Sequence, residues 1–254
     1  MFKIFRITLL LAILLGVIYE RWKAHHRTDW KMPLVVALYP IDADASPVAA
    51  EYVQNLKEET FEEIESFFDE ESRRYALPLP APVEVLLGSP VAETPPQPPR
   101  NGGAMDAVLW SLRFRWWASR HSDGVRRAPH ARIFLLYVDP ATHPVLEHST
   151  AIREGMIGLA HVFASKKQAK QNAVVIAHEL LHTLGATDKY DLHTTYPLHP
   201  EGFAEPDAAP LLPQRFAELM AGRTPLTPDR AEIPESLAHV LIGSHTAREI
   251  GWGK

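Results

Sequence analysis

AHELLHTLGATDKYD, residues 177–191, places two histidines four positions apart, with a glutamate directly after the first. On a helix, His178 and His182 lie one turn apart on the same face, so both imidazoles can reach one metal ion. Glu179 lies beside them, where its carboxylate can take a proton from a water molecule. The pattern therefore predicts a metal site that carries its own general base.

Two imidazoles do not complete a zinc site, and the residues that follow offer a third ligand. If the helix continued, Asp188 would lie about 9 Å further along its axis than His182 and would point away from it. Gly185 can adopt the left-handed conformation that ends a helix and turns the chain back, so Asp188 is predicted as the third ligand. Three later side chains could replace it if the turn is wider: Asp191, His193 and His199.

The composition limits the chemistry of the site and the class of partner. The 254 residues are 46% hydrophobic and 22% charged, which is typical of a globular domain with its own core. The sequence contains no cysteine, so a metal can be held only by His, Asp or Glu. The net charge of −5 offers no general attraction to nucleic acid, and we expect no nucleic-acid partner.

The first 28 residues differ in character from the rest of the chain. Residues 7–19 are apolar and uncharged, and Trp22 follows at a position that suits a membrane interface. Bulky and charged residues come after the apolar run, which favours an uncleaved anchor over a cleaved signal peptide. The sequence predicts a single-pass membrane anchor in residues 1–28, with the remaining chain on the extracytoplasmic (periplasmic or extracellular) side.

After this segment, strand-like and helix-like patterns alternate. Strands are predicted over residues 33–41, 83–87, 132–138 and 156–164, the last at the edge of the sheet. Helices are predicted over residues 46–74, 104–121 and from 165 through the quoted stretch. Ser46 and Pro47 form the expected N-cap and first residue of the first helix. This order of elements predicts an α/β (α+β) fold in layers.

The helix predicted over residues 104–121 has two apolar faces. Its first face consists of Met105, Val108, Leu109, Leu112 and Trp116, and its second of Trp110, Phe114 and Trp117. Arginines interleave with these aromatic residues, a pattern that could grip nucleic acid or a membrane surface. A helix between a sheet and a second layer also needs two apolar faces, and we expect this second arrangement.

HELLHTLGATD, residues 178–188, resembles the HExxHxxGxxH/D signature of metzincin zinc peptidases, with Asp in the third ligand position as in snapalysin-type peptidases. The longer HELLHTLGATDKYD resembles the HExxHxxGxxDxYD run of immune-inhibitor-A-type peptidases. The resemblance implies a twisted mixed sheet with a backing helix, an active-site helix, and a smaller irregular C-terminal half. That half would contain a methionine-bearing turn in AELMAGR, with Met220 as its methionine, and a C-terminal helix in SHTAREIGW.

Together with the predicted anchor, this resemblance implies a membrane-anchored zinc endopeptidase that hydrolyses a peptide or protein substrate. Residues 29–254 would form the metallopeptidase-like domain, divided into residues 29–186 and 187–254. Zinc would be held by His178, His182 and Asp188, and Glu179 would act as general base. Tyr190 or Tyr196 could donate a hydrogen bond to an oxyanion, as a tyrosine does in some family members, or could instead serve in packing or support the metal ligands. Asp191 is expected to organise its loop. Two alternatives stay open: a non-catalytic zinc-stabilised interaction module, and a zinc amidohydrolase acting on a cell-wall amide.

Overall fold

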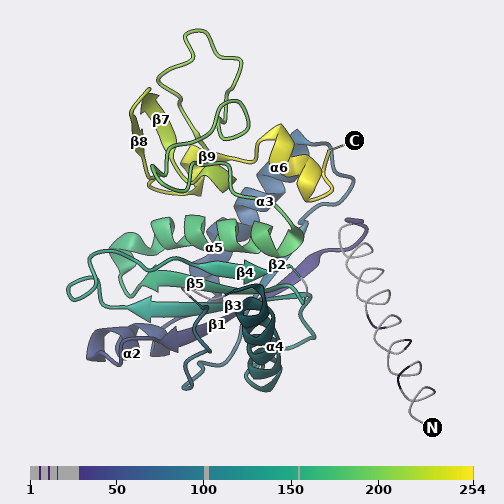
Figure 1. The fold of residues 1–254 in the computed structure, drawn as a ribbon, viewed down its shortest axis with the longest axis vertical. Coiled ribbons are helices and arrows are strands. Elements are labelled where there is room, and N and C mark those ends of the chain that lie inside the picture. Colours follow the sequence, from purple (N-terminus) through teal and green to yellow (C-terminus); the bar gives the residue numbers. More distant parts are fainter. Residues whose placement is uncertain are drawn as a thin grey trace.

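The protein has a mixed α/β fold built around one five-stranded sheet (Figure 1). The structure is a computed structural model that describes residues 29–99, 103–153 and 155–253, together with residues 6, 11 and 16. The strands are β1 (Leu34–Asp42), β2 (Val83–Leu87), β3 (Ala131–Val138), β4 (Thr150–Ile152) and β5 (Ile157–Phe163). Their order in the sheet is β2-β1-β3-β5-β4, and only β4 runs antiparallel to its neighbour. The predicted α/β class is confirmed.

Helices cover both faces of this sheet, which explains why its central strands are continuous apolar runs. α2 (Pro47–Gln54), α3 (Glu62–Arg74) and α5 (Ala169–Leu184) lie on one face, where Leu38, Phe68 and Leu181 share a core. α4 (Ala104–Arg120) packs on the other face through Phe114 and Trp117. β1, β3 and β5 are therefore buried along nearly their whole length.

The helix predicted over residues 46–74 is in fact two helices. α2 begins as predicted, because Ser46 Oγ accepts a hydrogen bond from the Ala49 backbone N–H at 3.0 Å. It ends before Asn55, whose side-chain amide and backbone N–H both donate to the Glu51 carbonyl. Such a side chain competes with the continuing helix for the same acceptor. A 3-10 turn, η1 (Glu58–Phe61), then leads into α3.

The edge of the sheet is formed by β4, so the prediction that residues 156–164 form the edge strand is wrong. β4 pairs with Ile157–Leu159, the first half of β5. Further along β5, Ser149 Oγ accepts from the His161 backbone N–H at 3.0 Å, and the side-chain amide of Asn172 bonds both backbone groups of Phe163. β4 is therefore the outer strand on this side of the sheet, and β2 is the outer strand on the other.

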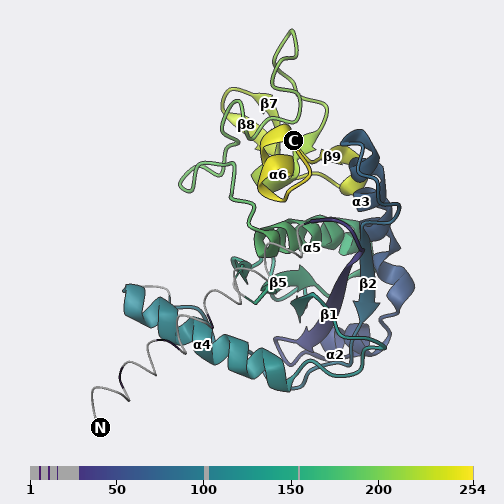
Figure 2. The same cartoon turned by 90° about the vertical axis from the view of Figure 1, so that its right-hand side faces the viewer.

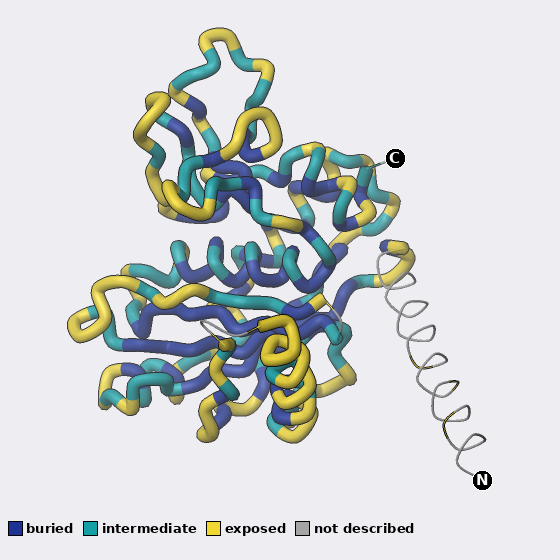
Figure 3. The backbone as a smooth tube through the Cα atoms, in the orientation of Figure 1, coloured by how far each residue is buried: buried dark blue, intermediate teal, exposed yellow. Residues whose placement is uncertain are grey.

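α4 packs on the sheet through one face only, so the expected position between two layers is wrong. Phe114, Trp117 and Ala118 are buried. The opposite stripe is exposed, with Met105 at 70% and Trp116 at 64% of their full accessible surface. Figure 2 shows α4 projecting beside the sheet, and much of it is drawn as exposed in Figure 3.

Short elements follow α5 and lie above it in Figure 1. They are β6 (Ala217–Glu218), η3 (Leu219–Ala221), β7 (Thr224–Thr227), β8 (Arg230–Glu232), η4 (Leu237–His239), β9 (Val240–Leu241) and α6 (Ser244–Glu249). The chain end ties α6 to the body of the protein, because Trp252 packs edge-on against Trp30 and Phe68. Trp30 Nε1 also donates to the Ile250 carbonyl at 2.7 Å.

The membrane location predicted from the sequence requires correction. Within residues 29–99, 103–153 and 155–253, together with residues 6, 11 and 16, no helix is long and apolar enough to cross a membrane. A span needs about 20 consecutive apolar residues, whereas α4 has 17 residues and contains three arginines. The predicted anchor, residues 1–28, lies outside the described residues except at positions 6, 11 and 16.

Candidate metal centre

α5 carries both histidines on the side that faces the C-terminal elements. The ring centroids of His178 and His182 are 4.6 Å apart, and the rings are nearly perpendicular at 83°. The core-facing side of the same helix buries Val174 and Leu181 against the sheet. Because this apolar side fixes the rotation of the helix, both imidazoles are held toward one point.

The helix ends at Gly185, as its sequence predicts. Gly185 has φ 105°, in the left-handed region, and the N–H of Ala186 donates back to the Leu181 carbonyl at 3.0 Å. These are features of a Schellman-type helix end. A Cβ at position 185 would also lie 2.8 Å from the guanidinium of Arg153. Glycine therefore meets both a conformational and a spatial requirement at this turn.

The reversal brings Asp188 to the two histidines. Oδ1 of Asp188 lies 3.3 Å from Nε2 of His178 and 3.2 Å from Nε2 of His182. The other side chains that the sequence left open have different contacts. The Asp191 carboxylate accepts hydrogen bonds from the backbone of His193 and from the backbone and hydroxyl of Thr194.

His193 is exposed, and His199 lies 3.2 Å from the Pro206 carbonyl oxygen through its Nε2. The hydrogen bonds that the Asp191 carboxylate accepts come from His193 and Thr194 of its own loop.

The opposite nitrogens of both rings face backbone carbonyls. Nδ1 of His178 lies 2.9 Å from the Leu219 oxygen, and Nδ1 of His182 lies 2.9 Å from the Ala186 oxygen. A carbonyl can only accept, so each Nδ1 carries the proton, and in a neutral ring the lone pair is then on Nε2. When both rings are neutral, as metal binding requires, two Nε2 lone pairs and one carboxylate oxygen converge. Such carbonyl contacts are the usual means of orienting a metal-binding histidine.

Glu179 Oε2 is a buried oxygen with no hydrogen-bond partner among the described residues, and the buried Asp188 Oδ1 lies against the Nε2 atoms of the two histidines. The Glu179 side chain is well buried, with the residue only 4% exposed. Ligand atoms of His178, Glu179 and His182 lie within 4.8 Å of one another. Buried acceptors without a donor are costly unless a positive charge joins them. The residues present therefore fit a divalent cation, and two nitrogens with one oxygen suit zinc.

The electrostatics of the cluster also favour positive charge. Burial alone would lower the pKa of His178, but the hydrogen bond to Asp188 and the charge of Glu179 outweigh it and raise this pKa to about 9. Burial would raise the pKa of Asp188, but the two imidazoles outweigh it and hold that pKa well below its usual range. The same field that favours a proton here favours a cation between the three side chains.

Glu179 has the environment of a general base. Burial raises the pKa of its carboxyl group, and the two neighbouring histidines only partly oppose this effect. A carboxylate with a raised pKa accepts a proton more readily than one in water. Its orphaned Oε2 atom is available for that proton.

Of the two tyrosines considered from the sequence, Tyr190 is next to the cluster. Burial, and after it the charges of Asp188 and Glu179 and a hydrogen bond with Asp188, raise the pKa of Tyr190 to about 12. Its hydroxyl therefore stays protonated and can donate. The Tyr196 hydroxyl instead donates to the Thr227 carbonyl at 2.7 Å.

The turn around Met220 lies against the candidate centre through backbone contacts. The Leu219 carbonyl accepts from His178, and the Met220 carbonyl accepts from the Lys189 backbone N–H at 3.0 Å. Met220 itself is fully buried. Glu218 holds the turn, since its carboxylate accepts from the backbone of Ala221 and from Thr246 of α6.

The sequence did not predict that Leu219 orients His178, because this contact is made by the Leu219 backbone carbonyl and does not depend on the side chain. One sequence feature did point to this turn: Glu218 is a charged residue between apolar neighbours, which is typical of a buried carboxylate that accepts hydrogen bonds.

The fold and side chains together define the class of site: a His-Glu-His-Asp cluster at the end of a helix that backs a mixed sheet. Comparison with models of known protein families and with curated proteins gives no match to this chain. The function of the chain must therefore be inferred from the geometry of the cluster.

Proposed function

We propose that this protein is a zinc-dependent endopeptidase of the metzincin type. The observation that carries the proposal is the convergence of His178, His182 and Asp188 on one point, with the buried Glu179 beside them. Further support comes from a mixed sheet, a turn at Met220 and a C-terminal helix, which follow one another in the order that the resemblance implies.

The proposed chemistry assigns one task to each side chain. A zinc ion, when bound, supplies a Lewis acid that lowers the pKa of water and polarises a carbonyl. Glu179 takes the proton from the attacking water and then delivers it to the departing amine. The protonated hydroxyl of Tyr190 donates a hydrogen bond to the oxygen on which negative charge develops.

The proposed substrate is a peptide in extended conformation. β4 (Thr150–Ile152) has an outer edge that can add a strand, and it contacts α5, which carries the histidines. Pairing with such an edge reads the peptide backbone and leaves side-chain preference to neighbouring pockets. Because β4 is the strand at this edge, we propose that the substrate pairs with β4 rather than with residues 156–164.

The alternative of a non-catalytic zinc module expects a fourth protein ligand, for which Asp191 and His193 were the candidates. The Asp191 carboxylate is already engaged by three donors of its own loop, and His193 is exposed. These contacts favour the peptidase. Among the described residues, no specific contact favours the cell-wall amidohydrolase.

A single experiment separates these functions. The purified chain is loaded with zinc, its metal content is measured, and it is incubated with a mixed peptide library whose products are identified by mass spectrometry. The peptidase predicts cleavage that 1,10-phenanthroline abolishes and added zinc restores. One bound zinc per chain without any cleavage would instead support the interaction module.

A further inference from the structure

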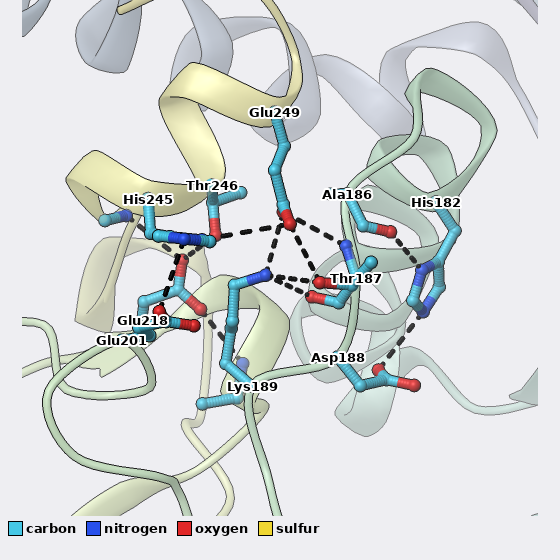
Figure 4. A network of polar contacts seen from close by, with 12 residues as sticks. His182, Ala186, Thr187, Asp188, Lys189, Glu201, Glu218, His245, Thr246 and Glu249 are labelled. Carbon is cyan, nitrogen blue, oxygen red and sulfur yellow. Dashed lines mark hydrogen bonds and ion pairs between the residues drawn. The ribbon is translucent and has the colours of Figure 1, made fainter.

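The residues on both sides of Asp188 are held by one side chain of α6, Glu249 (Figure 4). Oε2 of Glu249 accepts from the Thr187 backbone N–H at 3.1 Å, and Oε1 accepts from the Thr187 hydroxyl at 2.8 Å. Oε2 also accepts from Nζ of Lys189 at 2.8 Å. The candidate third ligand is thus the middle residue of a three-residue segment whose two ends bind the same carboxylate.

The buried Lys189 links the two ends of this segment, because its Nζ bonds both Thr187 and Glu249. The side chain of Lys189 is only 2% exposed. Its Nζ donates three hydrogen bonds: to the Thr187 carbonyl at 2.9 Å, to the Thr187 hydroxyl at 2.6 Å and to Glu249. An ammonium group has three hydrogens, so all of them have acceptors. A buried ammonium group that is fully hydrogen-bonded fixes geometry, because any other arrangement leaves its charge buried without a partner.

α6 is itself fixed, so the position of Glu249 is well defined. The hydroxyl of Thr246 donates to the buried carboxylate of Glu218 at 2.6 Å. Glu218 also accepts from the Gly243 backbone N–H, just before α6 begins. The same Glu218 carboxylate caps the turn whose Leu219 carbonyl orients His178. One C-terminal helix therefore braces both the turn under the first histidine and the segment that carries Asp188.

We infer that Glu249 and Lys189 are positioning residues that present Asp188 to the metal. This inference rests on the proposed zinc site, but it concerns residues that do not touch the metal. Gly185 allows the chain to reverse, and the Glu249 clamp (Glu249, Lys189 and Thr187) selects the one path of the reversed chain that directs the carboxylate toward His178 and His182. Outer residues of this kind typically change metal affinity 10- to 100-fold when they are altered, as an order-of-magnitude expectation.

The test measures zinc affinity of the full chain by competition with a chromophoric chelator. Glu249→Gln keeps the shape of the side chain but removes its negative charge, and its amide nitrogen cannot accept a hydrogen bond as the second carboxylate oxygen does. We expect its zinc dissociation constant to rise about 10- to 100-fold. Thr187→Val, a milder change that removes one hydroxyl donor, should raise it less. Glu235→Gln, at an exposed position, is the matched control and should leave zinc affinity unchanged.

A double-mutant cycle with Asp188→Asn distinguishes positioning from general stability. If Glu249 acts through Asp188, then Glu249→Gln should have little further effect on zinc affinity in the Asp188→Asn background. Cobalt-loaded protein adds a spectroscopic signature, since the visible bands should change in Glu249→Gln and not in Glu235→Gln. The melting temperature of the metal-free variants reports any purely structural loss.

Two results overturn the inference. Wild-type protein that binds zinc while Glu249→Gln and Thr187→Val bind it equally well would show that the clamp does not position the ligand. Additive effects of Glu249→Gln and Asp188→Asn on zinc affinity would show the same. Wild-type protein that binds no zinc is a separate outcome, because it overturns the proposed function and with it the basis of the clamp.

Discussion

Oδ1 of Asp188 lies 3.2 Å from Nε2 of His182, although the two residues are six positions apart in the sequence. A continuous helix would separate them by about 9 Å along its axis. The left-handed Gly185 makes the contact possible, and the Nδ1 atom of the same histidine binds the carbonyl of Ala186 within the reversed segment. The turn thus orients His182 and delivers the third candidate ligand at once.

Replacement of Gly185 should therefore affect both folding and metal binding. Gly185→Ala forces an L side chain into the left-handed region, which costs about 1–2 kcal/mol, and its Cβ would displace Arg153. We expect the free energy of unfolding, measured by urea titration, to fall by about this amount, and zinc affinity to fall with it. Gly103→Ala is the control, because its Cβ would meet nothing closer than 3.9 Å. Equal stability of the two variants would contradict the argument.

Glu179→Gln should separate metal binding from hydrolysis. The amide cannot take the proton of the attacking water, so the rate of peptide cleavage should fall by about 10²- to 10⁴-fold. Zinc content, measured by mass spectrometry of the metal, should stay at the wild-type level, since the two histidines and Asp188 are unchanged. Undiminished cleavage by this variant would refute the assigned base.

Zinc should stabilise the folded chain through a defined set of side chains. A ligand at about 100 times its dissociation constant adds about 2.7 kcal/mol to the free energy of unfolding. We expect zinc to raise the melting temperature of the wild type, and His182→Ala to lose that shift. His193→Ala should retain it, because His193 is exposed and lies outside the cluster. Loss of the zinc shift in His193→Ala would move the metal site to the loop after Asp188.

Tyr190→Phe should lower turnover more than it lowers zinc affinity. Removal of one donor to a developing oxyanion typically reduces kcat by about 10²-fold or more. Tyr196→Phe is the matched control, since its hydroxyl bonds the Thr227 carbonyl. The measurement is kcat and KM on a peptide identified in the library experiment. A similar kcat for both variants would assign Tyr190 to packing around Asp188 instead.

The Glu249 clamp should make stability depend on pH. Burial would raise the pKa of Glu249, but the bonds from Lys189 and Thr187 outweigh it and hold this pKa below the ordinary 4.5. A carboxyl group with a lowered folded-state pKa contributes stability that is present above the unfolded-state pKa and is lost as pH falls through the folded-state value. The metal-free wild type should therefore exceed Glu249→Gln in unfolding free energy at neutral pH.

This difference should shrink once the pH falls below 4.5. Urea titrations across pH 3–7 of the wild type, Glu249→Gln and Glu235→Gln provide the measurement. A difference that stays constant across this range would mean that the charge of Glu249 contributes nothing to the clamp.

Local features of the fold were readable from the sequence because they depend on neighbours along the chain. The N-cap at Ser46 is set by a side chain three residues from its partner, and the end of α5 by the conformational freedom of Gly185. The helical repeat likewise brings His178 and His182 together on one face. Apolar runs predicted four strands, which form β1, β2, β3 and β5.

Other features depend on contacts between distant parts of the chain, and no local sequence pattern predicts them. β4 has only three residues and exists because β5 offers it a pairing edge. The exposed face of α4 reflects the absence of a second layer over it in the described structure, which its own apolar pattern could not reveal.

The sequence alone therefore determined which side chains could bind a metal and where the chain could turn, because helix periodicity and glycine conformation act over a few residues. Only the tertiary structure decided which partners hold those side chains in place. His178 is oriented by a carbonyl 41 residues away, and the segment of Asp188 by a carboxylate about 60 residues away. Such contacts arise when packed elements bring distant residues together, so they follow from the assembled core rather than from any stretch of sequence.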